Sequence, residues 1–216
     1  STGQPHEGLV SGSGIASGGL PLVFVYTGMG PQWWAMGREL IENEPIVAAT
    51  LDEIDAIFRP LAGWSLKEAM LAPEAESRMA RTEVAQPANF ALQLALTRLW
   101  EAHGVRPAAV VGHSVGEVTS AFVAGVYTLE EAVRISYHRS HLQQSMAGQG
   151  AMLAVGLAEA EAERLLADSP GVSIAAINSF GAVTLSGDTA QLQQIAVVLE
   201  ARGVFNKFLR VEVAYH

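Results

Sequence analysis

Residues 108–118, AAVVGHSVGEV, decide the predicted fold, because a short apolar run leads directly into a glycine-flanked serine. Residues 108–112 are typical of a strand buried on both faces of a sheet. Residues 112–116 fit the pattern G-x-S-x-G, in which a serine occupies a strained turn between a strand and a helix. The glycines are needed because side chains there would collide with the neighbouring strand and helix. The stretch predicts an α/β fold with Ser114 exposed as a nucleophile and the N–H of Val115 directed at a developing oxyanion.

The segments around this turn predict a large α/β subdomain over residues 21–149. A β-prone run at 22–26 is followed by the glycine loop TGMGPQ and a helix over about 34–42. A helical pattern from 45 to 79 is broken at Pro60 and Gly63. An amphipathic helix is expected over 87–103, with proline at its start and Gly104 after its end, and another over 129–146.

After Gly150 the pattern changes to shorter elements. Strands are expected at 151–156, 172–178, 182–186 and 204–213, and helices at 158–168 and 189–202. The order β-α-β-β-α-β is typical of a ferredoxin-like fold, which predicts a small subdomain over 150–213 and a return to the large one at 214–216. Residues 1–20, rich in glycine and serine, are predicted to be a flexible linker.

Composition excludes several functions. Half of the 216 residues are apolar, which suits one globular domain, and the formal charge of −9 argues against nucleic acid as a partner. The absence of cysteine rules out disulfides and thiolate catalysis and fits a cytoplasmic protein. No apolar run approaches the ~20 residues of a membrane helix, and no secretory leader is recognisable. We therefore expect neither membrane insertion nor secretion.

A serine nucleophile needs a general base, and the residues alone leave the choice among five histidines open. His138 and His141 lie three residues apart on one predicted helix, but no third ligand is evident nearby, so a metal site is disfavoured. The candidates for the base are His6, His103, His138, His141 and His216.

Six segments together resemble the acyltransferase domains of modular and iterative polyketide synthases and the related malonyl-CoA:carrier-protein transacylases. The serine motif has the specific form G-H-S-x-G-E, Arg139 lies 25 residues after Ser114, and the sequence ends on an aromatic residue followed by histidine. The resemblance implies an α/β-hydrolase-like large subdomain with a ferredoxin-like small one. Its segments are VFVYTGMGPQWWAMG (23–37), TEVAQPANFALQLAL (82–96), VVGHSVGEVTSAFVAGVYTLEEAV (110–133), YHRS (137–140), INSFGAVTLSG (177–187) and VEVAYH (211–216).

The resemblance implies a role for each matching residue. Ser114 is acylated, His216 is the general base and Arg139 binds the free carboxylate of the extender unit. Arginine suits this task because its planar fork of donors matches a carboxylate and stays charged in a closed pocket. Residues expected to line the acyl site are Gln86, His113, Tyr215 and Asn178, although a turn residue between strands is an equal reading of Asn178.

Two departures from the family pattern are visible. The glycine loop usually reads G-Q-G and here is G-M-G, so Met29 keeps a backbone N–H for the oxyanion but offers no glutamine side chain. Family members also continue beyond the histidine with strands and helices that complete the large subdomain. The resemblance implies that this C-terminal part is missing here.

The residues next to the histidine bear on the choice of extender unit. In the family, a bulky aromatic residue before it accompanies malonyl units and a small serine accompanies methylmalonyl units. The stretch Val213-Ala214-Tyr215-His216 matches neither usual signature. Tyr215 and Val115 both favour malonyl over methylmalonyl.

The resemblance further implies that acyl-CoA is a substrate and that no cofactor is bound. The expected partners are an acyl carrier protein, reached through its phosphopantetheine thiol, and an adjacent ketosynthase domain. A serine hydrolase with Asp168 or Asp188 as the third triad member is one alternative. A non-catalytic scaffold that keeps the fold is another.

Overall fold

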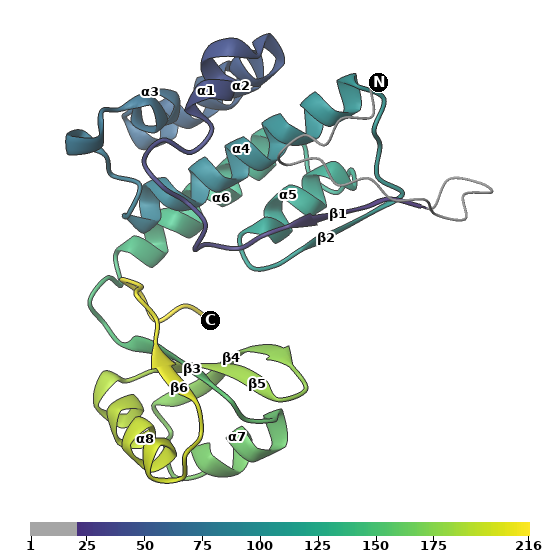
Figure 1. Ribbon diagram of the computed structural model, residues 1–216. Helices are drawn as coiled ribbons and strands as arrows, with labels where there is room; N and C mark the ends of the chain where they lie inside the picture. Colours follow the sequence, from purple (N-terminus) through teal and green to yellow (C-terminus); the bar gives the residue numbers. More distant parts are fainter. Residues whose placement is uncertain (1–20) are drawn as a thin grey trace, which may run out of the picture.

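The computed structural model describes residues 21–216, and the predicted linker at 1–20 lies outside this range. Figure 1 shows two lobes joined by two crossings of the chain. The larger lobe contains β1 (Val23–Tyr26), α1 (Arg38–Asn43), α2 (Pro45–Ala62), α3 (Leu66–Leu71), the 3-10 helix η1 (Glu74–Glu76), α4 (Thr82–Ala102), β2 (Ala109–Gly112), α5 (Gly116–Val123) and α6 (Leu129–Gln144). The smaller lobe contains β3 (Ala151–Val155), α7 (Glu159–Leu166), β4 (Val172–Ser179), β5 (Ala182–Gly187), α8 (Thr189–Ala201) and β6 (Asn206–Phe208).

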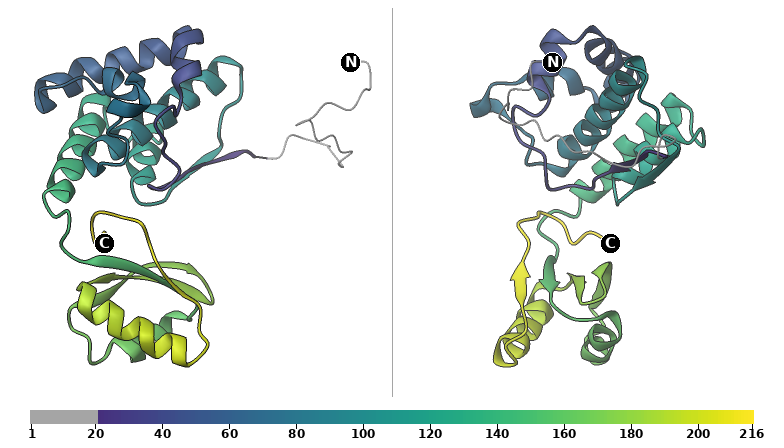
Figure 2. Two further views of the ribbon diagram at one scale, coloured as in Figure 1. Left: turned by 60° about the vertical axis from the view of Figure 1, so that its left-hand side comes forward. Right: turned by 45° about the vertical axis from the view of Figure 1, so that its right-hand side comes forward.

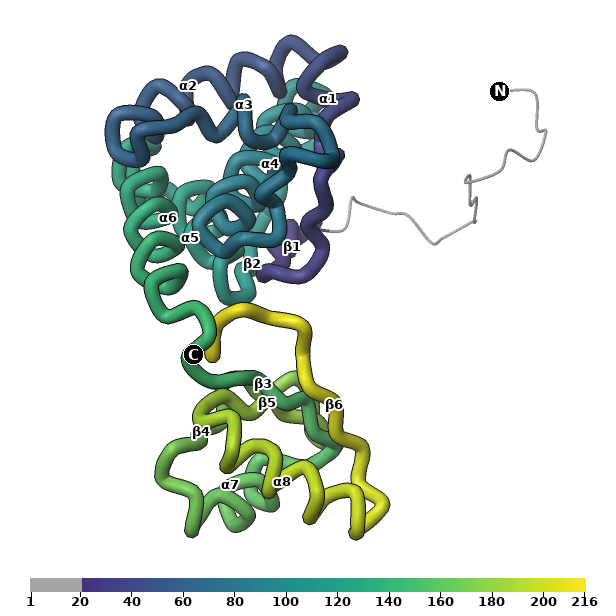
Figure 3. Tube along the Cα trace, turned by 90° about the vertical axis from the view of Figure 1, so that its left-hand side faces the viewer, coloured from purple at the N-terminus to yellow at the C-terminus, as the bar shows by residue number. Residues whose placement is uncertain are grey.

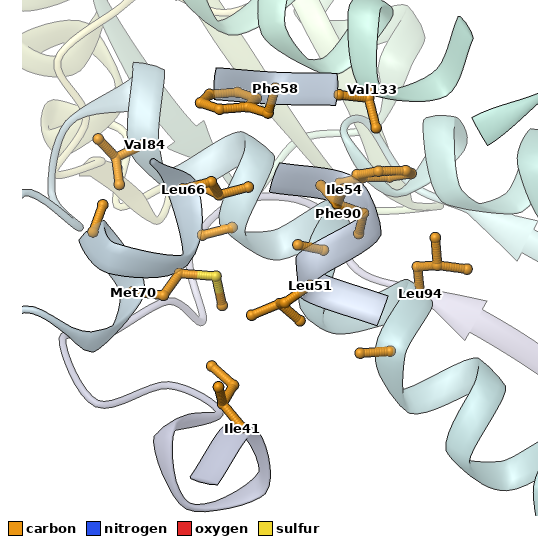
Figure 4. Packing of buried hydrophobic residues seen from close by; sticks show 14 of the residues in the cluster. Ile41, Leu51, Ile54, Phe58, Leu66, Met70, Val84, Phe90, Leu94 and Val133 are labelled. Atoms are coloured by element: carbon orange, nitrogen blue, oxygen red, sulfur yellow. The ribbon is translucent and has the colours of Figure 1, made fainter. Parts of the chain in front are cut away.

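The core of the larger lobe lies between helices rather than on a sheet. Figure 4 shows side chains from α2, α4 and α6 meeting in its centre. Phe58 and Phe90 are each 1% exposed. Burying a side chain of this size stabilises the fold by about 1.5 to 3 kcal/mol. The core therefore fixes α4 against α6, the two helices that carry Gln86 and Arg139.

The parallel pair β1 and β2 corrects one prediction. The strand at 109–112 is not buried on both faces, because Val111 is 53% exposed and its register partner Val25 is 67% exposed. Within residues 21–216 this sheet has two strands, and α5 packs against both of them. The apolar run thus reflects parallel pairing beside a helix, without cover on the other side.

The smaller lobe is a four-stranded antiparallel sheet with the order β4-β5-β3-β6. Its elements follow the predicted order β-α-β-β-α-β. Figure 2 shows α7 and α8 on the face away from the larger lobe. Because side chains alternate along a strand, Leu153 and Leu185 pack towards these helices, whereas Met152 and Thr184 line a cleft between the lobes.

The last segment of the chain differs from the predicted strand at 204–213. β6 ends at Phe208, and the following residues leave the sheet and cross back to the larger lobe, as Figure 3 shows in yellow. The crossing is held by backbone bonds from Leu209 N–H to Met152 O (2.9 Å) and from Gly148 N–H to Glu212 O (2.8 Å). Residues 209–213 therefore form a connection between the lobes, of which Val213 is the one buried residue.

Helix α4 begins five residues earlier than predicted, at Thr82, so Pro87 lies inside it. Proline there removes one backbone hydrogen bond. The extra turn is stabilised by burial, since Val84 and Ala85 are fully inaccessible to solvent. This turn carries Gln86. The first predicted helix also starts later than expected, at Arg38 instead of Trp34.

Candidate active site

Ser114 occupies the predicted sharp turn between β2 and α5. Its backbone φ of 52° lies in the left-handed region, which is uncommon for a residue with a side chain and marks stored strain. A Cβ atom at Gly112 would lie 2.4 Å from Gly116 O, and one at Gly116 would lie 2.2 Å from Tyr26 O. Both positions therefore require glycine, which confirms the steric reason predicted for this motif.

His216 reaches Ser114 from the crossing segment. Its Nε2 lies 2.8 Å from Ser114 Oγ, within hydrogen-bond distance. Among the histidines in residues 21–216, it is the one whose ring bonds to the serine: the Nδ1 of His103 instead lies 2.8 Å from Leu99 O. His6 lies outside the described residues. The geometry therefore selects among candidates that the residues alone left open.

His138 and His141 lie against a tyrosine. The ring of His141 stacks on that of Tyr137 at a centroid distance of 5.6 Å, and the ring of His138 meets Tyr137 edge-on at 5.0 Å. In residues 21–216 there is no cluster of three or more His, Cys, Asp or Glu residues arranged to hold a metal ion.

The backbone N–H groups of Met29 and Val115 remain the predicted donors to an oxyanion. Met29 lies in the loop after β1 and Val115 directly precedes α5, and neither N–H donates to a protein acceptor within residues 21–216. The partial positive charge of a helix N-terminus adds to the attraction at Val115. The loop is held by Gln32, whose Oε1 accepts from Gly30 N–H at 2.8 Å and from Asn89 Nδ2 at 3.3 Å.

Arg139 projects from α6 towards the serine, with its Nη2 3.1 Å from Ser114 Oγ. Its Nη1 donates to Gln86 Oε1 across the interface between α4 and α6. Helix α6 starts in register because Thr128 and Glu131 form a capping box, with Thr128 Oγ1 accepting from Glu131 N–H at 3.2 Å. Arg139 forms no ion pair with a carboxylate in the described part of the chain.

The cleft between the lobes has a volume of about 340 Å³ and contains Ser114 and His216. Asn178 lies in β4 rather than in a turn, and its Nδ2 donates to Thr184 Oγ1 at 2.9 Å. The buried Tyr215 lies 2.5 Å from Thr82 Oγ1 through its hydroxyl oxygen. The lining of this cleft includes the predicted residues Met29, Gln86, His113, Asn178, Tyr215 and His216. Arg139 and Val115 are not part of this lining: Arg139 reaches the site through its bond to Ser114 Oγ, and Val115 is fully buried.

The environment of His216 favours its neutral form. Partial burial lowers its pKa below the ordinary value of 6.5, and the positive charge of Arg139 and the nearby His113 lower it further. A base must be deprotonated to accept a proton, so a lowered pKa keeps His216 active to lower pH. We expect the acid limb of the pH profile for Ser114 acylation to lie below pH 6.5, and a midpoint at or above 6.5 would contradict this environment.

Known proteins of one family resemble this chain. Residues 23–216 match the family described as "Acyl transferase domain". The chain belongs to this acyl transferase family. It is similar to the pikromycin polyketide synthase component PikAII of Streptomyces venezuelae, with 40% identity over 97% of this chain and 6% of the relative.

Solved acyltransferases have the same fold. The acyltransferase domain from the second module of the salinomycin polyketide synthase is 41% identical, with a TM-score of 0.82 over 91% of this chain and 46% of that one. The malonyl-CoA:ACP transacylase of Synechocystis sp. PCC 6803 is 27% identical, with a TM-score of 0.76 over 91% of this chain and 64% of that one. The described residues thus have the α/β fold of these acyltransferases. The chain spans less than a tenth of PikAII and 46% and 64% of these two solved chains.

Three polar residues of this acyl transferase site were missed by sequence reasoning. Gln32 holds the glycine loop, Thr82 bonds to Tyr215, and the Oε1 of Gln143 accepts from Gln86 Nε2 at 2.5 Å. Thr82 and Gln143 each act on a predicted site residue from a distant part of the sequence, whereas Gln32 acts locally on the loop that contains Met29. Spacing carries no signal for such pairs, although Gln32 and Thr82 do lie within the segments that resemble the family.

Within residues 21–216, no helix has the length and apolarity needed to cross a membrane.

Proposed function

We propose that this domain transfers a malonyl-type extender unit from coenzyme A, through an ester on Ser114, to the phosphopantetheine thiol of an acyl carrier protein. The observation that carries the substrate class is the place of Arg139, 3.1 Å from the serine oxygen and without a carboxylate partner in the described residues. A half-buried guanidinium with unused donors favours an acyl group that brings its own carboxylate. Burial lowers the pKa of Arg139, but the ordinary pKa of a guanidinium is so high that the cation persists at neutral pH.

In the first step, Ser114 Oγ attacks the thioester carbonyl carbon while His216 Nε2 takes the hydroxyl proton. The carbonyl oxygen becomes an oxyanion, which the N–H groups of Met29 and Val115 stabilise. The intermediate collapses by breaking the carbon–sulfur bond. The coenzyme A sulfur leaves with the proton from His216, and the acyl group stays on Ser114.

In the second step, the pantetheine thiol gives its proton to His216 and attacks the serine ester. The carbon–oxygen bond breaks, Ser114 recovers the proton, and the acyl group leaves as a thioester. The serine and histidine supply all the acid–base chemistry, so the scheme requires no bound metal or redox cofactor. The free carboxylate stays with Arg139 throughout.

The thiol is expected to outcompete water. A narrow cleft that excludes water and admits a thin thiol would favour transfer without a further catalytic group. With acylated protein and a phosphopantetheinylated carrier protein, thioester formation should exceed release of the free acid. Dominant release would instead favour the hydrolase alternative.

The hydrolase alternative has little structural support. Asp188 caps α8 by accepting from Gln191 N–H at 2.9 Å, and Asp168 follows α7 in the smaller lobe. Neither carboxylate bonds to the ring of His216. An arginine beside the nucleophile also has no use in a pocket for neutral esters.

The proposal also covers the subdomains of the chain and its neighbouring domain. We assign residues 21–149 to an α/β-hydrolase-like subdomain, 150–213 to a ferredoxin-like one and 214–216 to the return to the larger lobe. The antiparallel order β4-β5-β3-β6 supports the second assignment. We further propose an adjacent ketosynthase domain and a cytoplasmic location, and the similarity to a polyketide synthase component supports a place within a larger synthase.

Malonyl is the extender unit that the cleft favours. The Tyr215 ring is 8% exposed and its hydroxyl is tied to Thr82, so the ring is held where it narrows the cleft beside the base. A single methyl group is worth about 1 to 3 kcal/mol in such a pocket. With both CoA esters in competition, malonyl should predominate on Ser114, and Tyr215→Ser should shift the ratio towards methylmalonyl. A methylmalonyl excess of about tenfold in the unaltered protein, roughly 1.4 kcal/mol, would overturn this assignment.

A further inference from the structure

Gln86 is the buried link between two side chains of α6. It is 1% exposed, and both ends of its carboxamide are occupied. Its Oε1 accepts from Arg139 Nη1, and its Nε2 donates to Gln143 Oε1 at 2.5 Å. A carboxamide has one accepting end and one donating end, so the partner at one end determines what the other end offers.

We propose that Gln143 is a positioning residue for recognition of the acyl carboxylate, acting through the orientation of the Gln86 amide. By accepting from Nε2, Gln143 fixes the Gln86 oxygen against Arg139. The guanidinium is then anchored through Nη1, and Nη2 remains directed at the serine. This inference rests on the proposed function, because it assigns the consequence to binding of a dicarboxylic acyl group.

The alternative orientation of Gln86 shows why the anchor matters. A flipped amide would place an NH2 group against the guanidinium, which also has donors only. Arg139 would lose its accepting partner on α4 while remaining half-buried, and a partly desolvated charge without a partner is unfavourable. Two contacts therefore favour the same orientation: the donor-only guanidinium of Arg139 requires the Gln86 oxygen, and Gln143 gives the Gln86 Nε2 its acceptor.

The geometry of α6 places Arg139 and Gln143 on the same side of the helix, facing Gln86. Gln143 lies four residues after Arg139 on α6, so the two side chains share a face and meet Gln86 across the packed interface with α4. The guanidinium is thus arranged before an acyl group arrives, and pre-arrangement lowers the cost of binding. The effect should fall on recognition of the carboxylate rather than on attack at the carbonyl.

The neighbouring Gln144 provides a matched control. Its Oε1 accepts from Glu83 N–H at 3.2 Å, and its Nε2 donates to Glu212 Oε2 at 3.2 Å. It also joins α6 to α4, but it does not contact Gln86 or Arg139. A general loosening of the interface would therefore appear in Gln144→Met as much as in Gln143→Met.

The test is a comparison of acylation by malonyl-CoA and by acetyl-CoA. Gln143→Met keeps the length of the side chain and removes the acceptor. We expect kcat/KM for malonyl-CoA to fall about five- to tenfold, mainly through KM, with acetyl-CoA changed by less than twofold. Gln144→Met should leave the malonyl/acetyl ratio unchanged. In a Gln86→Met background, Gln143→Met should add no further loss, because residues that act through one another are not additive.

Three outcomes would each overturn the inference. Gln143→Met could lower the rates with both esters equally, it could give the same malonyl/acetyl ratio as Gln144→Met, or its loss could add to that of Gln86→Met. Arg139→Ala separates this failure from failure of the proposed function. If Arg139→Ala lowers malonyl use selectively while Gln143→Met does not, carboxylate binding stands and the role of Gln143 is wrong. If Arg139→Ala is not selective either, both are wrong.

Discussion

Ser114→Ala is expected to abolish acylation by malonyl-CoA and by methylmalonyl-CoA, with a loss on the order of 10⁶-fold, as for a serine that acts as a unit with its histidine. The Oγ atom is the one that bonds to His216 Nε2, and alanine keeps the Cβ that the turn already accommodates at φ 52°. The folded structure should therefore be retained. Acylation rates and thermal unfolding of the two proteins, measured side by side, check both statements.

Ser120→Ala is the matched control for this variant. Ser120 lies on α5, and its Oγ donates to Glu117 O at 3.0 Å, away from the cleft. It should keep normal acylation. An alanine variant of Ser114 that still gains the acyl group would mean that another side chain is the nucleophile.

Arg139→Ala is expected to lower kcat/KM for dicarboxylic acyl donors. The loss of transition-state binding should be roughly 2 to 5 kcal/mol, the range for removing one partner of a desolvated charged contact. Use of acetyl-CoA should hold or rise, because that acyl group has no carboxylate to bind. Rates with malonyl-CoA and acetyl-CoA, measured on one preparation, give the selectivity directly.

Arg134→Ala is a suitable control because Arg134 lies on the same helix and is largely exposed, with Glu130 3.9 Å away. An exposed ion pair of this kind contributes little to stability. Arg134→Ala should leave both rates within about twofold of those of the unaltered protein. Equal losses of kcat/KM for the two esters in Arg139→Ala would show that Arg139 supports the helix interface instead of binding the acyl carboxylate.

The serine turn could be predicted from sequence because its glycines lie within two residues of Ser114. A Cβ atom at Gly112 would collide with the first turn of α5, whereas one at Gly116 would collide with Tyr26 in β1, a contact that only the fold reveals. The choice of base could not be made in this way. His216 reaches Ser114 across 102 residues, and its place depends on how the crossing segment returns from the smaller lobe.

The boundaries that sequence reasoning misplaced were set by tertiary packing. Proline at 87 suggested a helix start, but burial of Val84 and Ala85 extends α4 by one turn and carries Gln86 into the cleft. One strand was predicted over 204–213, but after Phe208 the backbone bonds to Met152 and Gly148. Local pattern identified the types of element, and tertiary contacts determined where they begin and end.

The most direct test of the account is the intact mass of the protein after incubation with malonyl-CoA, followed by fragmentation to locate the adduct. We predict a mass increase of one malonyl group, which is carried by Ser114 and is lost when a carrier-protein thiol is added. A protein that gains no mass, or carries the group on another residue, would contradict it.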